Sequence, residues 1–568
     1  MSLSDYLPAN WDSPLRLAAF FISAPIIVFL LWVLVSYGRV LYLRSRMPPG
    51  PFPYPIVGNI GRVPAAKPYL IFEKWSKEYD SPLITIWTGN RPTIVVNDCW
   101  AASDLMDKRA QIYSSRPHSY LADAFDETEN NQTSLVYGDK WRLHRRITVS
   151  CLYRYCCYLR CLLLTAFQHT VVGSQAVRGY RTFQANESKI LIRDIMETQQ
   201  FVSAIERYAC SVAAIIGWGR RVRSMDDDLA KLALSFVQTG AGFSAPAQYL
   251  VEAYPWISKL PKCIYPFPSM IWDEGQKLLK YFYALTVEGA QLEQDSFSKR
   301  LIQDQENNNK LSPKEIASLT GNLIGGGVDT TTTTIIVFIF AMCAFPRVQQ
   351  KAQEEIDRVL AGEPPTWADE DSLPYCKALL TEIFRWRAAI ALGGPPHAPV
   401  HDDSYKGMFI PRGTSIIGNL WAIHRNPRDY PYPDEVRPER FLEERQPNPS
   451  KKGIFTFGWG RRLCSGQPLA EQGIWFTIVG LLWSFKMRST DEHGNSKELD
   501  VFAFNDSPAP RPLPFTVEFK PRTSNTKGII QAAALKAEDE LRKYDTYSKT
   551  DLSPMPDGPN ARPNPVFM

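Results

Sequence analysis

One loop near the C-terminal end of the chain is decisive for the fold: Phe457-Gly458-Trp459-Gly460-Arg461-Arg462-Leu463-Cys464-Ser465-Gly466. It reads F-x-x-G-x-R-x-C-x-G, a single cysteine in a glycine-rich turn with an arginine and an aromatic ring at fixed spacing before it. A structural cysteine in a tight turn is one interpretation. The number of positions that match at fixed spacing favours a functional loop, provided that the rest of the chain supplies a matching context.

The motif resembles the haem-binding loop of the cytochrome P-450 family. By this resemblance Cys464 is the thiolate ligand of the iron in haem b, the iron protoporphyrin cofactor. Gly460 and Gly466 are expected to let the backbone approach the porphyrin and to adopt conformations that a Cβ excludes. Arg462 is expected to donate to a haem propionate, and Phe457 to shield the sulfur from water.

A pair of charged residues upstream supplies part of the context. Apolar residues recur at helical spacing from Leu373 to Arg387, and Glu382 and Arg385 lie on one face of that predicted helix. Alone, this E-x-x-R pair would be an ordinary surface pair. In the family, however, the E-x-x-R of the K helix contacts an arginine from a later loop, and Pro438-Glu439-Arg440-Phe441 resembles that loop. The resemblance therefore implies a structural triad of Glu382, Arg385 and Arg440.

The longest helical signal runs from Ser312 to Ala344 and begins with a capping box, Ser312-Pro313-Lys314-Glu315. Inside it, Gly325-Gly326-Gly327-Val328-Asp329-Thr330 carries three glycines, which cost about 3 kcal/mol against alanine in a helix. The segment resembles the I-helix signature of the family. Asp329 and Thr330 are then the acid–alcohol pair that delivers protons during catalysis. A seam of small residues for helix packing is the alternative interpretation.

Two further segments match family contacts to the haem propionates. Trp141-Arg142-Leu143-His144-Arg145 resembles the W-x-x-x-R of the C helix, so Trp141 and Arg145 are expected to hold a propionate. His397, in Pro395-Pro396-His397, stands where the family places another donor. A histidine in a loop is as often simply exposed.

The N-terminal region predicts a membrane anchor. Residues 17–38 carry no charge, and as a helix they span about 33 Å, enough to cross a hydrocarbon core. A cleaved signal peptide is the alternative, although its apolar region is usually shorter. Arg39, Arg44 and Arg46 follow the run and only Arg16 precedes it closely, which places the catalytic domain in the cytosol. As in microsomal members of the family, the prediction is a single-pass anchor in the endoplasmic reticulum membrane.

The pattern favours a mainly α fold with small β-sheets (α+β), in one large domain. The chain is 45% hydrophobic, enough for a sizeable core, and its net charge of +5 is too small to indicate nucleic-acid binding. Short strand signals lie at Leu83–Trp87, Thr93–Val96, Gly407–Ile410 and Ser415–Ile417. The predicted organisation is a luminal N-terminus (1–16), an anchor (17–38), a basic and Pro-rich hinge (39–55), the cytochrome P-450 domain (56–522), and a partly disordered C-terminal extension (523–568) with a helix at Lys527–Lys543.

The resemblance implies a haem-thiolate monooxygenase that uses O2 and receives electrons from NADPH–cytochrome P-450 reductase. The basic residues Lys451, Lys452, Arg461 and either Arg142 or Arg146 are expected to face an acidic flavin module, although ordinary solvated charges would give the same pattern. A haem-thiolate isomerase or dehydratase is one alternative, but such enzymes usually lack the acid–alcohol pair. A non-catalytic haem-binding membrane protein is the other alternative.

Substrate identity is the least determined property. By the layout of the family, specificity is expected in residues 116–135, 236–268, the I helix, 388–395 and 502–508, which are rich in Phe, Tyr, Ala and Pro. This composition favours an apolar or aromatic small molecule. The overall pattern is similar to fungal microsomal members resembling O-methylsterigmatocystin oxidoreductase, which suggests secondary metabolite biosynthesis.

Residues 149–168 differ from their surroundings, since they hold four of the ten cysteines. The cysteine spacing fits no metal site, and two arginines argue against a membrane-dipping loop. Deleting the segment joins Thr148 to His169, as in the uninterrupted run of the family. Val149-Ser150 can be encoded by a splice-donor consensus and Gln168 by an acceptor, so we hypothesise a translated intron rather than a real insertion. Sequencing of the messenger RNA decides between the two.

Overall fold

A computed structural model describes residues 14–126, 128–149, 174–233, 250–261, 263–265, 267–307, 311–442 and 448–546. The hypothesised intron lies outside the described residues from residue 150 onward. So do residues 236–249 of one expected specificity stretch and residues 547–568 of the C-terminal extension.

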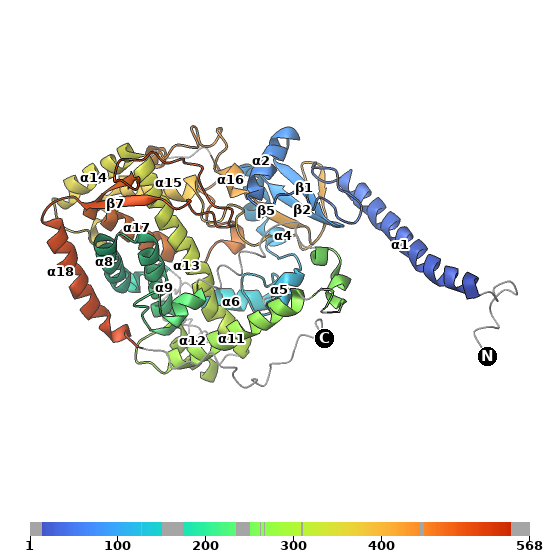
Figure 1. The fold of residues 1–568 in the computed structure, drawn as a ribbon, viewed down its shortest axis with the longest axis horizontal. Helices are drawn as coiled ribbons and strands as arrows, with labels where there is room; N and C mark the ends of the chain where they lie inside the picture. Colours follow the sequence, from blue (N-terminus) through green and yellow to red (C-terminus); the bar gives the residue numbers. More distant parts are fainter. Residues whose placement is uncertain are drawn as a thin grey trace, which may run out of the picture.

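The described part is dominated by helices, as predicted (Figure 1). The α-helices are α1 (Pro14–Arg44), α2 (Pro68–Glu78), α3 (Cys99–Ala102), α4 (Ala110–Tyr113), α5 (Tyr120–Ala124), α6 (Asp139–Val149), α7 (Ser174–Gly179), α8 (Arg181–Thr198), α9 (Phe201–Trp218), α11 (Phe267–Ala290), α12 (Phe297–Asn307), α13 (Pro313–Ala344), α14 (Pro346–Leu360), α15 (Pro374–Trp386), α16 (Leu420–Ile423), α17 (Gln467–Ser484) and α18 (Thr526–Leu541). A π-helical segment, η2, follows α3 (Ser103–Lys108). The 3-10 turns are η3 (Leu250–Glu252), η4 (Pro255–Lys259), η5 (Trp367–Ser372), η6 (Pro438–Phe441), η7 (Gly460–Arg462) and η8 (Arg542–Tyr544).

Three small sheets flank the helices. β1 (Leu83–Thr88) pairs antiparallel with β2 (Arg91–Val96), and β2 pairs parallel with β5 (Ser415–Gly418). β3 (Asp403–Tyr405) pairs with β4 (Met408–Ile410), and β6 (Phe485–Thr490) pairs with β7 (Thr516–Pro521). All four strand segments predicted from the sequence are present, and the prediction of a mainly α fold with small sheets is confirmed.

The N-terminal helix α1 extends away from the rest of the molecule (Figure 1). Its segment Ser23–Arg44 is long and apolar enough to cross a membrane, and most of its side chains are exposed. Phe201–Trp218 and Pro313–Ala344 also reach that length and hydropathy, but they are mostly buried inside the molecule. The end of α1 is attached to the domain, since Val40 belongs to a buried cluster and the Tyr37 hydroxyl donates to the carbonyl of Pro53 at 3.0 Å.

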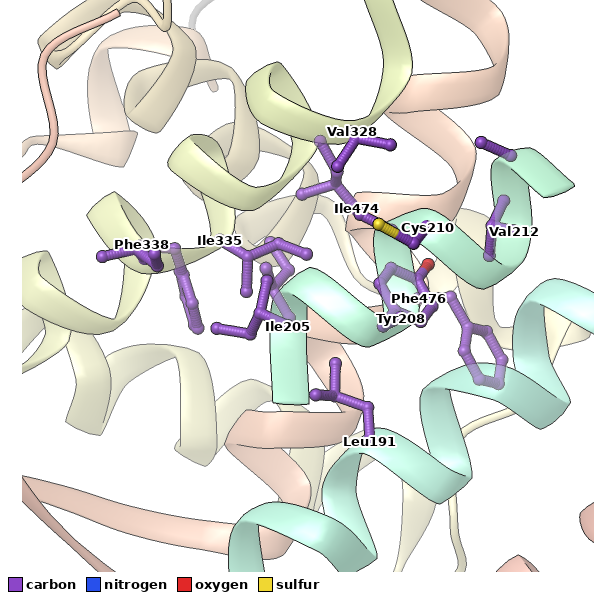
Figure 2. Packing of buried hydrophobic residues seen from close by; sticks show 14 of the residues in the cluster. Leu191, Ile205, Tyr208, Cys210, Val212, Val328, Ile335, Phe338, Ile474 and Phe476 are labelled. Atoms are coloured by element: carbon purple, nitrogen blue, oxygen red, sulfur yellow. The ribbon is translucent and has the colours of Figure 1, made fainter. Parts of the chain in front are cut away.

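The main core forms where α8, α9, α13 and α17 pack together (Figure 2). Leu191 comes from α8, Ile205 from α9, Ile335 from α13 and Ile474 from α17, and each is at most 2% exposed. The long helix α13 runs through this core, which explains why apolar side chains surround its C-terminal half. The core thereby fixes the position of the glycine-rich turn in the same helix.

The start of α13 is joined to α6 through one buried carboxylate. Ser312 and Glu315 form the predicted capping box, and Glu315 Oε1 also lies 3.0 Å from His144 Nε2 and 3.4 Å from Lys140 Nζ. These partners outweigh the burial of Glu315 and lower its pKa to about 2. The contact ties the helix that carries Trp141 to the helix that carries Asp329.

We expect this carboxylate to make stability depend on pH in the acid range. The pKa of Glu315 is lower in the folded state than its ordinary value of 4.5, so its charge stabilises the fold above about pH 4.5 and this contribution is lost as the pH falls toward 2. Glu315→Gln keeps a side chain that can complete the capping box but removes the charge. At neutral pH the free energy of unfolding of the variant should be about 1 kcal/mol lower than that of the native protein.

The measurement is the free energy of unfolding of both proteins at several pH values. The difference between them should shrink as the pH falls from 4.5 toward 2. A difference that stays constant over that range would contradict the ionic role of Glu315.

The C-terminal helix α18 packs alongside α8 (Figure 1). Ile530, Ala534, Ala537 and Leu541 lie on its buried face and join the main core. Polar contacts flank this face: Arg193 donates to Glu538 at 2.8 Å, and Asn186 donates to Glu540 at 2.7 Å. The helix expected at Lys527–Lys543 is therefore present, and it is integrated with the domain.

Candidate active site

The cysteine loop precedes helix α17 and is held by its own backbone. The N–H of Cys464 donates to the carbonyl of Phe457 at 2.8 Å, which closes the loop. Gly458 has φ 84° and Gly460 has φ 53°, values that favour glycine. The ring of Phe457 packs edge-on against Phe384 of α15, with centroids 5.0 Å apart. The loop is thus anchored to the helix that carries the E-x-x-R pair.

Gly460 and Gly466, which were predicted to let the backbone approach the porphyrin, differ in their local conformation. A Cβ on Gly460 would lie 2.2 Å from the carbonyl oxygen of Met106, so glycine is required there by contact with η2 as well as by its φ. Gly466 has φ −82°, which any residue can adopt, and a Cβ there would meet only Cys464 Sγ, at 3.8 Å. The conformational expectation therefore holds for Gly460 and is wrong for Gly466.

Cys464 lies just before the N-terminus of α17, where helix N–H groups favour negative charge. Its side chain is exposed. The surrounding protein raises the pKa of the Cys464 thiol, whereas the N–H groups of Gly466 and Gln467 and the guanidinium of Arg145 act in the opposite direction. These donors are suited to stabilise a thiolate, the form in which cysteine binds a metal.

Three arginines gather beside the loop without acidic partners. Arg462 donates to the carbonyls of Ser114, Gln132 and Leu135 at 2.6–3.2 Å. Arg116 likewise donates only to backbone carbonyls, those of Thr133, Pro395 and Pro396, and Arg145 donates to the carbonyl of Leu463 at 2.5 Å. Within the described part of the chain, none of the three forms an ion pair with a carboxylate.

The electrostatics of this arginine cluster fit an anionic ligand. Burial, together with repulsion from Arg116 and Arg145, lowers the pKa of Arg462 to about 8. Carboxylates brought by a ligand would relieve that repulsion. The donor set therefore fits the haem that the resemblance implies, with a thiolate for its iron and guanidinium groups for its two propionates.

Trp141 and His397 lie next to the cluster. The guanidinium of Arg462 lies over the ring of Trp141, 4.5 Å from its centroid, and Trp141 is buried. His397 is buried rather than exposed, and its Nδ1 lies 2.8 Å from the carbonyl oxygen of Tyr113. Burial and the nearby arginines lower the pKa of His397 to about 3, so its ring is neutral.

The glycine-rich turn of α13 has an open face. A Cβ added to Gly326 or Gly327 would meet no atom within 4 Å. One turn later, Thr330 Oγ1 donates to the carbonyl oxygen of Gly326 at 2.7 Å. A threonine that bonds back in this way tends to bend a helix, and here it fixes the position of the hydroxyl.

Asp329 is held by an arginine that the sequence did not predict. Arg511 Nη2 donates to Asp329 at 2.5 Å and its Nη1 donates to Glu206 of α9 at 2.8 Å. Its Nε donates to Thr333 at 3.2 Å. Arg511 precedes β7, far along the chain from α13, so only the fold brings the two together.

The structure brings Glu382, Arg385 and Arg440 into one buried cluster. Arg385 forms two hydrogen bonds with the carboxylate of Glu382, at 2.7 and 2.9 Å, and Arg440 Nε donates to it at 3.1 Å. Glu382 and Arg385 have fully buried side chains. Arg385 also donates to the carbonyls of His424, Pro433 and Glu435. The cluster therefore joins α15 to the segment 424–440 and has a structural role.

The chain is similar to a known protein family and to several individual proteins. The family model described as cytochrome P-450 matches residues 48–509. The cytochrome P-450 monooxygenase virE of Hypocrea virens is 30% identical over 531 residues, covering 90% of this chain and 91% of that protein. Cytochrome P-450 monooxygenase 113 of Postia placenta is 32% identical, covering 86% of this chain and 94% of its own. Cytochrome P-450 monooxygenase FrzL of Cladobotryum sp is 30% identical, with 87% and 92% covered.

Proposed function

This chain belongs to the cytochrome P-450 family and is a monooxygenase, and on that premise we propose that it hydroxylates or epoxidises an apolar small molecule in fungal secondary metabolism. The family uses a haem-thiolate cofactor, O2 and a redox partner. We propose that the cofactor is haem b, bound through Cys464, with Arg145, Arg462, Trp141 and His397 around its propionates. When bound, haem supplies the activation of O2.

The observation that carries the proposal is the arrangement of Asp329 and Thr330. The Thr330 hydroxyl is fixed on the glycine-rich turn, whose open face leaves room for a flat group. The carboxylate of Asp329 is oriented by Arg511, which also donates to Thr333 one turn further along the helix. An acid and an alcohol on adjacent residues can hold and pass protons, which O2 activation requires and an isomerase does not.

The proposed substrate is apolar because apolar side chains dominate the expected specificity stretches. Of these, residues 502–508 contribute Phe502 and Phe504, and residues 388–395 contribute Ala388 and Ala391. Their aromatic and small aliphatic surfaces suit a planar or polycyclic molecule. The relatives named above are fungal monooxygenases, which supports a role in fungal metabolism.

The function is tested with labelled dioxygen. The protein, reconstituted with NADPH–cytochrome P-450 reductase in membranes, is incubated with a panel of polyketide and terpenoid compounds under isotopically labelled O2. We expect NADPH-dependent products that carry one labelled oxygen atom. Products formed without NADPH and O2 would instead support the haem-thiolate isomerase or dehydratase.

Thr330→Ala is expected to uncouple electron transfer from product formation. The variant should keep its haem and bind substrate, because the hydroxyl contacts only the helix backbone. Without the hydroxyl, proton delivery is impaired, and product formed per NADPH should fall about tenfold or more while peroxide rises. Thr331→Ala is the matched control. Unchanged product per NADPH in Thr330→Ala would refute the role.

We propose that electrons come from the membrane-bound NADPH reductase. The apolar helix α1 would hold the domain at the endoplasmic reticulum membrane, where that reductase resides. Exposed Lys451 and Arg461 would face the reductase, and Arg142 and Arg461 both lie over the ring of Tyr137. Lys452 pairs with Glu471 at 2.6 Å, so it offers less free charge than its position in the sequence suggested.

A further inference from the structure

A cavity lies beside α15, next to the E-x-x-R cluster. It has a volume of about 110 Å³ and is lined mainly by Trp386, Arg387, Trp421, Arg425, Phe502 and Phe504. The volume exceeds that of a single water site and approaches that of an apolar cavity of about 150 Å³ known to bind benzene. Its lining combines flat aromatic rings with two buried cations outside the E-x-x-R cluster, Arg387 and Arg425, and Arg385 of that cluster also lines it.

Arg387 is the more isolated of the two cations. It is 7% exposed, and it donates to the backbone carbonyls of Trp386 and Val501. Within the part of the chain that the structure describes, its Nε has no hydrogen-bond partner. The guanidinium lies 4.1 Å from the ring centroid of Trp386, so the faces of the group are covered while an N–H edge remains unpaired.

Arg425 shows a similar arrangement, and its guanidinium shares the rings of Trp421 and Phe502 with Arg387. It is 8% exposed and lies 3.9 Å from the ring centroid of Trp421. Its Nη2 forms an ion pair with Asp434, a half-exposed residue, but its Nη1 is buried without a hydrogen-bond partner among the described residues. Two unpaired donors therefore line one cavity.

Positively charged side chains outnumber carboxylates around the cavity. Arg385, on the same wall, already shares Glu382 with Arg440. Burial, followed by repulsion from Arg425 and Arg385, lowers the pKa of Arg387 well below its usual range. Asp500 attracts Arg387 only at longer range, and within the described residues no carboxylate forms an ion pair with it. Leaving such a cation unpaired is costly, and a bound anion would relieve the cost.

We propose that this cavity binds a carboxylate that is attached to a planar aromatic body. The carboxylate would accept from Arg387 Nε and Arg425 Nη1, and the aromatic body would stack among the rings of Phe502 and Phe504. A phosphate would satisfy the same donors but would leave the aromatic walls unused. The proposal rests on the proposed function only in that Phe502 and Phe504 also belong to an expected specificity stretch, whereas Arg387 and Arg425 belong neither to the cysteine loop nor to the acid–alcohol pair.

The test uses the full-length haem protein with benzoate as the probe. Calorimetric titration should show that benzoate binds and that benzamide, its neutral isostere, binds about tenfold or more weakly, since a hydrogen-bonded charge is lost. Arg387→Gln should weaken benzoate binding by a similar factor. Arg488→Gln, which alters an exposed arginine paired with Glu518, should not. The carbon monoxide spectrum of each variant reports whether it is folded.

Three results would overturn the proposal: no benzoate binding to the native protein, equal binding of benzoate and benzamide, or equal weakening by Arg387→Gln and Arg488→Gln. The comparison of the two ligands needs no variant, so it remains decisive if Arg387→Gln does not fold. Among supporting results, a change in the Soret spectrum on binding would indicate that the carboxylate is part of a substrate. An unchanged spectrum would indicate a separate effector.

Discussion

Replacement of Cys464 by alanine is expected to abolish the thiolate-dependent absorbance band of the reduced, carbon monoxide-bound protein. Cys464 is the only sulfur in the loop 457–466, and it is exposed beside the donors that stabilise its anion. The other cysteines of α9 and α15, Cys210 and Cys376, are buried, and burial raises the pKa of each thiol. Neither can take over as the ligand.

The measurement is a carbon monoxide difference spectrum of purified protein. Ser465→Ala is the matched control, because it changes the neighbouring side chain and leaves the sulfur in place. It should keep the band. A Cys464→Ala protein that retains the band would refute the assignment of the ligand, whereas loss of the band in both variants would indicate general damage to the loop.

Glu382→Gln is expected to destabilise the domain by about 3–5 kcal/mol. The substitution leaves the buried guanidinium of Arg385 without its bidentate partner and removes the carboxylate to which Arg440 Nε donates at 3.1 Å. Desolvation of a charge without compensation is the physical cause. The protein should lose its haem at a markedly lower temperature than the native form.

The stability of this variant is measured by thermal and denaturant unfolding, followed through the haem band and far-ultraviolet circular dichroism. Asp371→Asn is the control, since Asp371 pairs with Lys377 entirely at the surface. Such pairs contribute little to stability. Equal stability of the Glu382 variant and the control would contradict a structural role for the triad.

The parts of the fold that depend on local sequence were predictable. The capping box of Ser312 and Glu315 defines the start of α13, and proline and alternating apolar residues mark the other helix and strand boundaries. The cysteine loop was recognisable because its residues are close in sequence. Its residues and their surroundings can be located in the structure, while their catalytic roles remain predictions.

Contacts between distant segments were not predictable from the sequence. Arg511 looks like any arginine in a Pro-rich loop, and its pairing with Asp329 follows only from the way the loop before β7 packs against α13. Arg116 and Arg387 likewise resemble surface charges until the fold buries them. For Gly466 the prediction failed in a different way. Its position in the motif suggested a conformation that a Cβ excludes, but its φ of −82° is open to any residue.

The attachment of α18 has a consequence for the biosynthesis of the protein. Ile530 and Leu541 belong to the same core as Leu191 and Ile335, so this core cannot close before α18 has left the ribosome. By then α1, which precedes the domain in the chain and is long and apolar enough to cross a membrane, has already been synthesised. Folding of the catalytic domain is therefore expected to finish only after α18 has been synthesised. Until α18 docks, chaperones would encounter an open core.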